Sequence, residues 1–353
     1  MLVTVAVILC GCGSGGPKGG EAAELRLLVP SPGPPLPAQT GAYVWAVGDP
    51  RFAFASTDGG ATWTTSHPQK TDEPDVYRGV AFSDTRHGWA VGQRTIAASS
   101  DGGATWTTHT VATGSLHAVA CTDAKHVWVV GGQGDGNLPL VLASSDGGTT
   151  WSEQHVATHC DLGSVVFVDS RHGWMVGQDV DGPWCFVLAT TDGGAHWHVQ
   201  YRAARTIQLA GLAASDTRHA WVAGWSQGAT DSTPGLIIAT TDGGAHWKTQ
   251  PSGRVGALLS IAFPDARHGW ATGQKGVILA TRNGGKTWVA QHSGVSRDLR
   301  NATFSDLTHG WAVVDKWGLL ATENGGRTWT VVLPGEPGRM VWDVAALNKG
   351  YAK

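Results

Sequence analysis

The sequence predicts an all-β fold, a seven-bladed β-propeller with four-stranded antiparallel blades, and two observations carry this prediction. The first is a short motif, seen as TTDGGAHW at 190–197 and again at 240–247, that occurs seven times in related forms. The second is the spacing, because the Trp residues of successive copies lie 41 to 50 positions apart and each repeat contains four short apolar runs. A repeat of about 40 to 45 residues with four strands is typical of a propeller blade.

The composition suits a large core and repeated turns. The 353 residues carry a net charge of −3, and 41% of them are hydrophobic, which gives no indication of nucleic-acid binding. The chain contains 50 Gly and 18 Trp residues but only 14 Met, Tyr and Phe residues together. Repeated tight turns and repeated Trp positions explain that imbalance.

The first 42 residues differ in composition from the rest of the chain. The apolar run from Leu2 to Leu9 is too short to span a bilayer, which needs about 20 residues, and is typical of an export signal. The run ends in Leu-Cys-Gly-Cys, which resembles the lipobox of bacterial lipoproteins, although the usual Lys or Arg before it is absent. We expect a signal peptide over 1–12 with lipidation at Cys12, and a disordered Gly, Pro and Ser tether over 13–42.

The repeated motif predicts a hairpin turn and not a catalytic site. Its Asp side chain can accept hydrogen bonds from nearby backbone N–H groups, and its two Gly residues adopt positive φ without steric cost. Two copies carry Asn instead, which keeps the accepting oxygen but has no charge. We therefore assign a structural role to this position in all seven copies: Asp58, Asp101, Asp146, Asp192, Asp242, Asn283 and Asn324.

A second motif, DxxH followed by GWAVG or a close variant, alternates with the first along 43–353. Its six His residues do not indicate a metal site, because each lies on its own blade, and we expect each to bond the Asp three residues before it. The first repeat lacks the strand that precedes this motif, and the C-terminal segment WDVAAL resembles the missing strand. We predict that the N- and C-terminal strands pair within one blade and close the ring.

The first motif is identified as the Asp-box, or BNR repeat, and the interleaved DxxHGWAVG segments resemble those of the photosystem II stability and assembly factor family. The resemblance covers roughly residues 43–353. It implies a seven-bladed propeller that serves as a non-enzymatic binding scaffold. Because blade-building residues carry the resemblance, it does not transfer the photosystem partner.

We expect the binding surface on the face that carries the variable connections. In a four-stranded blade the DxxH and Asp-box turns share one face, and the connections after the second and fourth strands share the other. These connections gather Arg and aromatic residues, as recognition surfaces do. The predicted partner-binding residues are Arg94, Arg202, Arg205, Arg254, Arg297, Arg300, Tyr77, Tyr201, Trp184, Trp225 and Trp317. The DxxH face, with its own ring of basic residues, remains an alternative.

Three cysteines lie beyond the N-terminal pair. Cys121 replaces an apolar Phe of other repeats, so we expect it to be buried. Cys160 and Cys185 fall in connections of the same repeat, and an exported protein can form disulfides. We therefore predict a disulfide between Cys160 and Cys185.

These observations predict a non-enzymatic, exported and lipid-anchored propeller that binds a protein, as an assembly or stability factor for a membrane complex. The alternatives are a carbohydrate-binding propeller, with Trp184 or Trp225 as stacking platforms, and a sialidase-like glycoside hydrolase. For the hydrolase, Glu73 and Tyr77 form the one nearby pair of the required types. We expect no catalytic residues, metal or cofactor, and membrane contact only through the lipid on the bacterial cell membrane.

Overall fold

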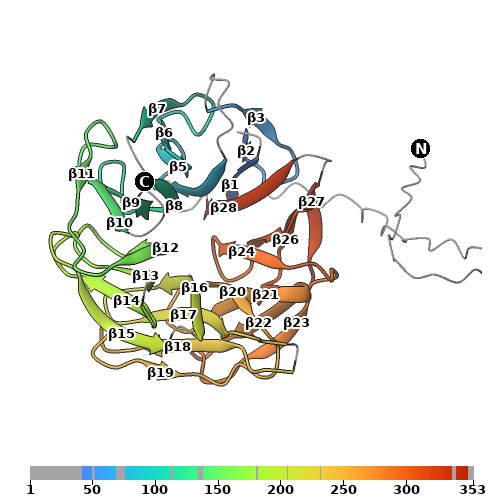
Figure 1. Ribbon diagram of the computed structural model, residues 1–353. Helices are drawn as coiled ribbons and strands as arrows, with labels where there is room; N and C mark the ends of the chain where they lie inside the picture. The colour runs from blue at the N-terminus through green and yellow to red at the C-terminus, as the bar shows by residue number, and fades with distance from the viewer. Residues whose placement is uncertain are drawn as a thin grey trace, which may run out of the picture. The chain divides into compact units, whose positions relative to one another are not determined.

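The computed structural model describes residues 42–49, 52–68, 76–111, 114–133, 138–179, 182–204, 206–230, 232–335 and 339–348. These residues form seven four-stranded antiparallel sheets, arranged as blades around a central channel (Figure 1). The predicted seven-bladed propeller is confirmed. The predicted signal peptide, tether and lipidated Cys12 lie outside the described residues.

The blades are numbered along the chain, and their strands are given from the channel outward. Blade 1 contains β28 (Met340–Asn348), β1 (Ala42–Asp49), β2 (Phe52–Ser56) and β3 (Thr64–Ser66). Blade 2 contains β4 (Tyr77–Phe82), β5 (Gly88–Gly92), β6 (Thr95–Ser99) and β7 (Thr107–Thr110). Blade 3 contains β8 (Ser115–Cys121), β9 (Val127–Gln133), β10 (Leu138–Ser144) and β11 (Ser152–Glu153).

Blade 4 contains β12 (Cys160–Phe167), β13 (Gly173–Asp179), β14 (Trp184–Thr190) and β15 (His198–Ala204). Blade 5 contains β16 (Ile207–Ala214), β17 (Ala220–Ser226), β18 (Leu236–Thr240) and β19 (Lys248–Thr249). Blade 6 contains β20 (Leu258–Ala262), β21 (Gly269–Gly273), β22 (Val277–Thr281) and β23 (Val289–His292). Blade 7 contains β24 (Leu299–Phe304), β25 (Gly310–Val314), β26 (Gly318–Thr322) and β27 (Thr330–Pro334). A short 3₁₀ turn, η1 (Gln274–Gly276), joins β21 to β22.

The ring closes as the sequence predicts. β28, at the C-terminal end, pairs antiparallel with β1 along its length and supplies the innermost strand of blade 1, beside β4 and β24 (Figure 1). Blade 1 is therefore completed by both ends of the described chain. Because β28 supplies this strand, blade 1 has the same four strands as the other blades, and the backbone groups of β1 are not left unpaired at an open sheet edge where another chain could add.

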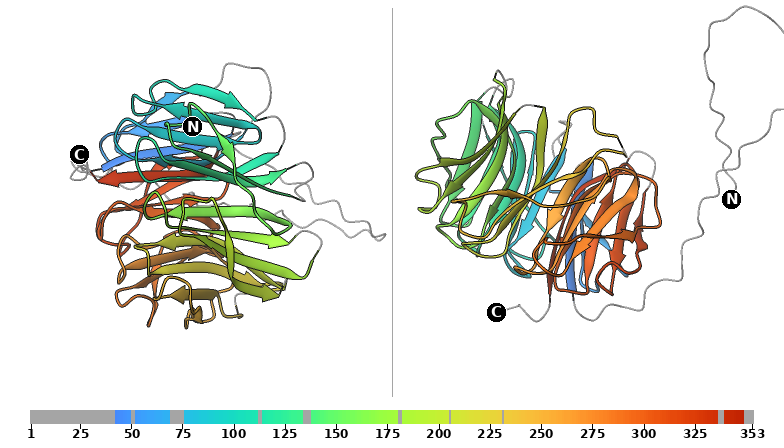
Figure 2. Two further views of the ribbon diagram at one scale, coloured as in Figure 1. Left: turned by 90° about the vertical axis from the view of Figure 1, so that its left-hand side faces the viewer. Right: turned by 90° about the horizontal axis from the view of Figure 1, so that it is seen from below.

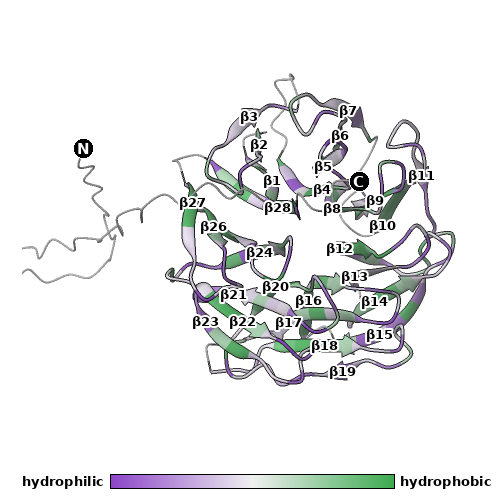
Figure 3. Cartoon of the chain, turned by 180° about the vertical axis from the view of Figure 1, so that it is seen from behind, coloured by the Kyte–Doolittle hydropathy of each residue, from purple (hydrophilic) through white to green (hydrophobic). Residues whose placement is uncertain are grey.

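Burial follows the position of a strand within its blade. The second strands are buried along their length, as in GWAVG of β5, because neighbouring blades cover both faces of the sheet. The outer β7 is exposed at every position. Figure 3 shows apolar colour on many strands and polar colour on many connections. Among the described residues, none forms a helix that is long and apolar enough to cross a membrane.

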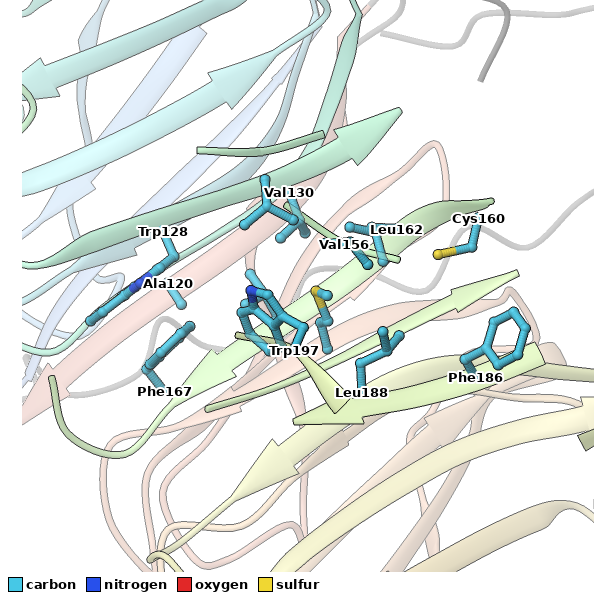
Figure 4. Close-up of a cluster of buried hydrophobic side chains, with 13 residues drawn as sticks. Ala120, Trp128, Val130, Val156, Cys160, Leu162, Phe167, Phe186, Leu188 and Trp197 are labelled. Atoms are coloured by element: carbon cyan, nitrogen blue, oxygen red, sulfur yellow. The ribbon is translucent and has the colours of Figure 1, made fainter. Parts of the chain in front are cut away.

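Aromatic side chains fill the spaces between blades. Trp128 of β9 stacks on Phe167 of β12 with ring centroids 3.6 Å apart, and Trp197 meets the same Phe edge-on at 5.9 Å (Figure 4). The same arrangement recurs at three other blade interfaces, around Phe82, Phe263 and Phe304. Each such group joins a second-strand Trp of one blade to the Asp-box Trp of the next, which explains the high Trp content.

Hydrogen bonds from the second-strand Trp residues also join the blades. In six of them the indole Nε1–H donates to the carbonyl of an Asp-box Gly in the next blade, over 2.8 to 3.2 Å: Trp45 to Gly102, Trp89 to Gly147, Trp128 to Gly193, Trp221 to Gly284, Trp270 to Gly325 and Trp311 to Gly59. Trp174 instead donates to Gln200, whose amide donates to Gly243. The last bond of the six crosses the closing interface between blades 7 and 1.

Candidate protein-binding face

The molecule has two different faces, seen edge-on in Figure 2. The Asp-box face carries the DxxH and Asp-box turns, and the loop face carries the connections after the second and fourth strands. Within a blade the two turns bond each other, as when Gly102 N–H donates to the Arg86 carbonyl at 2.9 Å. Equivalent bonds occur in blades 3 to 7. The repeated sequence therefore builds one face, and the variable sequence occupies the other.

The Asp-box residues have the structural role that the sequence predicts. In blade 3, Asp146 accepts hydrogen bonds from the Thr150 N–H, the Thr150 hydroxyl and the Ser144 hydroxyl. The Thr150 hydroxyl, followed by its N–H and then Ser144, lowers the pKa of Asp146 to about 2. Asn283 and Asn324 accept the same backbone bond from Thr287 and Thr328 without a charge. These side chains are occupied in holding the turn.

The six DxxH histidines bond the Asp three residues earlier, as expected. Their Nδ1 atoms lie 2.8 to 2.9 Å from a carboxylate oxygen of that Asp in His87, His126, His172, His219, His268 and His309. The same carboxylates also accept backbone N–H groups of the turn. Within the part of the chain that the structure describes, no three His, Cys, Asp or Glu residues come together as metal ligands.

Most of the predicted partner-binding residues do lie on the loop face or at its edge. The exposed ones are Arg94, Arg254, Arg297, Arg300 and Trp184, and the half-buried ones are Trp225 and Trp317. They come from different blades, so the structure does not gather all of them into one patch. Arg94 lies in blade 2, for example, whereas Arg297 enters blade 7.

Three of the predicted positions need correction. Tyr77 is fully buried inside β4, where it packs in the core cluster with Trp45 and Phe82, so it cannot meet a partner. Tyr201 and Arg202 lie on β15, an outer strand at the rim, because the segment taken for a connection continues the sheet. The Arg202 guanidinium lies 5.7 Å from the centre of the Phe186 ring. Arg205 lies outside the described residues.

The predicted disulfide is wrong. Cys160 and Cys185 are both buried free thiols. They lie on β12 and β14, and β13 runs between them, since Cys160 pairs with Asp179 and Cys185 with Gln178. Two strand spacings amount to about 9.6 Å, beyond the reach of a disulfide at about 7 Å. The Cys185 thiol instead donates to the Ile207 carbonyl at 2.9 Å. Burial raises the pKa of Cys160 to about 11.

The structure brings together one group of cations that the sequence left dispersed. We define the basic sector as the described cations of the loop-face connections between β19 and β28, together with the start of β24: Arg254, Lys275, Arg297, Arg300, Lys316 and Arg339. All six are exposed. Against these six cations the described residues of the same segments carry two carboxylates, Asp298, which accepts the Lys275 N–H, and Asp315, which accepts Arg300 Nε–H at 2.6 Å. A positive excess therefore remains on this part of the loop face.

Two lysines of the basic sector have an unusual backbone conformation. Lys275 and Lys316 occupy equivalent positions in the connections after the second strands of blades 6 and 7, with φ of 54° and 53°. Every other described residue with positive φ is Gly. The left-handed region costs a residue with a Cβ about 1 to 2 kcal/mol, and such residues concentrate at functional sites.

Of the charged residues that line the central channel, sequence reasoning identified Arg300 and missed the others. The cavity there has a volume of about 460 Å³ and is lined by all seven inner strands. Arg78, His117 and Asp343 line it, although none was among the predicted partner-binding residues. Aligning the inner strands by their repeats would have singled out Asp343, because this acidic residue occupies the position that small residues hold in blades 2 to 4, namely Gly79, Ala118 and Ser164.

A family model described as photosynthesis system II assembly factor YCF48 matches residues 69–159 and 254–348, just over half of the chain. The chain belongs to the YCF48 family. The second matched segment contains every residue of the basic sector, and its end is β28, the strand that closes the ring. No curated protein sequence matches the chain.

Several solved structures share the fold. YCF48 from Cyanidioschyzon merolae has a TM-score of 0.57 at 20% identity, over 77% of this chain and 88% of that one. A structure titled YCF48 bound to D1 peptide has a TM-score of 0.56 at 18% identity, over 74% and 89%. The GH74 enzyme of Niastella koreensis has a TM-score of 0.65 at 13% identity, over 83% of this chain but only 52% of its own length.

Proposed function

We propose that this protein is a non-enzymatic scaffold that binds an acidic segment of a membrane-complex subunit and supports assembly or stability of that complex. The basic sector is the observation that carries the proposal. It joins six exposed cations on the face where the connections vary, next to the half-buried Trp317. Arg and Trp are enriched where protein interfaces concentrate their binding energy.

The geometry of the sector favours a polypeptide over a single ion. Its cations come from successive connections around blades 5 to 7, so they extend over a surface instead of converging on one point. The Lys275 and Lys316 positions hold two of the charges on tight turns, which reduces the entropy lost when a partner binds. An acidic segment bound along these connections would place its carboxylates beside the cations of successive blades.

The family supports a protein partner. One YCF48 structure is described as bound to D1 peptide, and this chain shares that fold and family. We transfer only the class of partner, a polypeptide from a membrane complex.

Two observations favour a scaffold over a glycoside hydrolase. The Asp-box carboxylates are occupied by turn hydrogen bonds. Tyr77, the nearest candidate for a sialidase-like nucleophile, is buried. The likeness to the GH74 enzyme concerns the fold, and this chain spans about half of that enzyme.

Crosslinking to solubilised native membranes tests the proposal. The full chain is compared with Arg297→Glu/Lys316→Glu in the basic sector and with Arg171→Glu/Arg218→Glu on the Asp-box face. Both variants change the net charge equally. We expect one membrane protein to be captured by the wild type and the Asp-box-face variant, and to be reduced at least about ten-fold with the basic-sector variant, the effect of about 1.4 kcal/mol. Equal capture by all three would contradict it, and loss only with the Asp-box-face variant would move the site to that face.

We also propose that Cys12 carries a lipid that anchors the propeller on the outer side of a bacterial membrane. The Leu-Cys-Gly-Cys sequence after an apolar run supports this. Metabolic labelling with an alkyne fatty acid should mark the wild-type chain in the membrane fraction. Cys12→Ser should lose the label, and a Cys10→Ser control should keep it. Label that persists in Cys12→Ser would overturn the assignment.

A further inference from the structure

Each of the seven inner strands contains a β-bulge at the same level of the channel. In blade 2, Tyr77 pairs with Gly92 and Gly79 pairs with Val91, so Arg78 is left without a partner in the ladder. The register shifts at the same level in blades 1 and 3 to 7, and in blade 5 Gly211 is left out of the ladder together with Ala210. The residues at this level, in ring order from blade 1, are Trp342, Arg78, His117, Gly163, Ala210, Leu259 and Arg300.

A bulge bends its strand and redirects one side chain, and bulges are common beside functional sites. Here they lie near the loop-face end of the inner strands, and six of these seven residues line the channel cavity. The repeated β-bulge therefore places one residue of each of six inner strands at the mouth of one cavity of about 460 Å³. That volume lies within the range of small-molecule sites.

The bulged residues divide the mouth into two unlike halves. Blades 7, 2 and 3 supply Arg300, Arg78 and His117, which are cationic or able to donate hydrogen bonds, whereas Trp342 of blade 1 does not line the cavity. Blades 4, 5 and 6 supply Gly163, Ala210 and Leu259, of which the first two are small. The hydrogen-bond donors of Arg300 and Arg78 therefore lie across the channel from the small residues of blades 4 and 5.

The two arginines keep unused donors in this arrangement. Arg300 uses Nε to bond Asp315, and its guanidinium lies 5.7 Å from the centre of the Trp342 ring. Arg78 makes one hydrogen bond among the described residues, from Nη1 to the Ser115 hydroxyl at 3.4 Å. Both side chains are exposed at the channel. The remaining Nη–H groups of both arginines are therefore available to an anion in the cavity.

Nearby carboxylates partly compensate both arginines, and Asp161 attracts Arg78 as well as His117, so the mouth offers an anion the unused Nη–H donors of two guanidinium groups and not a net positive charge. Asp315 is held by Arg300, and Asp161 lies 3.3 Å from His117 Nδ1. The Asp343 carboxyl lies deeper in the wall, where it accepts hydrogen bonds from the Val80 and Val344 N–H groups.

We propose that the loop-face mouth of the central channel binds a small anion, through a carboxylate or phosphate group held between Arg78 and Arg300. The guanidinium groups supply charge and paired donors, which suit either group. The small residues of blades 4 and 5 leave room for the remainder of the ligand. The site shares Arg300 with the basic sector, whereas Arg78 lies outside that sector, so the Arg78 variant separates anion binding in the channel from capture of a polypeptide.

Isothermal titration of the full chain with inorganic phosphate, and separately with citrate, tests the proposal. We expect saturable binding of at least one probe with a stoichiometry of one. Arg78→Gln should weaken it at least ten-fold, whereas Arg86→Gln, which removes a cation of the same blade on the Asp-box face, should leave it unchanged. Preference for citrate would indicate a carboxylate ligand, and preference for phosphate a phosphorylated one.

Arg300 needs a paired variant because its loss would leave Asp315 without a partner. Arg300→Gln/Asp315→Asn removes both charges and should also weaken binding at least ten-fold, with the thermal unfolding temperature checked for each variant. Absence of saturable binding to either probe would overturn the proposal. Equal weakening in Arg78→Gln and Arg86→Gln would also overturn it, because the attraction would then be diffuse. Neither result would bear on capture of a protein by the basic sector.

Discussion

Replacing Asp343 tests how the propeller closes. This carboxyl lies in the channel wall on β28, the strand that joins the two ends of the described chain. It accepts hydrogen bonds from the Val80 N–H of blade 2 and the Asn301 amide of blade 7, and from its own neighbour, Val344. One side chain thus bonds both blades that flank the closing strand.

Burial in the channel wall raises the pKa of Asp343 from 3.8 to about 7, and the hydrogen bonds from Val80, Val344 and Asn301 oppose this rise. Each pKa unit corresponds to about 1.4 kcal/mol, so the difference is worth about 4 kcal/mol. Because the folded protein holds this proton more tightly than the unfolded chain, the contribution is complete below about pH 4 and is lost as the pH rises through 7. Stability attributable to this group therefore falls toward neutral pH.

Urea unfolding of the wild type and of Asp343→Asn between pH 4 and 8 measures the effect. The Asn amide would place a donor against a backbone N–H, which costs about 1 to 3 kcal/mol at every pH. We expect the wild type to be the more stable at pH 4 and to lose up to about 4 kcal/mol relative to the variant by pH 8.

The difference between the two proteins isolates Asp343 from other titrations. Asp161, beside His117 near the channel mouth, also has a pKa raised by burial, and its titration is common to both proteins. The Asp-box and DxxH carboxylates, such as Asp84, have a lowered pKa, so their contribution is lost only as the pH falls below about 4. A difference that stays constant from pH 4 to 8 would refute the reasoning.

Three further predictions concern the repeat. Trp311→Phe removes the 3.0 Å bond to Gly59 across the closing interface and should lower the free energy of unfolding by about 1 kcal/mol, measured in urea. Gly103→Ala, at φ of 89°, should cost at least about 1 kcal/mol in the same assay, and no loss would contradict the turn geometry. Alkylation in denaturant without reductant should label both Cys160 and Cys185, and labelling that requires reductant would show a disulfide.

The repeat made the fold predictable from sequence. Asp-box and DxxH motifs specify turns through local hydrogen bonds, such as Asp84 to His87, and these need no knowledge of distant residues. Seven copies at regular spacing fix the number of blades, and the degenerate last repeat reveals how the ring closes. The face that carries the variable connections followed from strand alternation alone.

The candidate sites were less predictable, because they depend on which residues meet across blades. Tyr77 and Arg202 were assigned to connections, yet hydrogen bonding extends the sheets through both positions. The disulfide failed for a related reason, since β13 separates two cysteines that are close in the chain.

Local sequence by itself determined the blades, their number and their two faces, since short-range turn chemistry repeats in every unit. Only the tertiary structure placed Arg78 and Arg300 in one channel and gathered the basic sector from five connections. Circular closure brings residues more than 200 positions apart into contact, as Val80 and Asp343 show. Such contacts depend on the register and bulges of each inner strand, which no local pattern specifies.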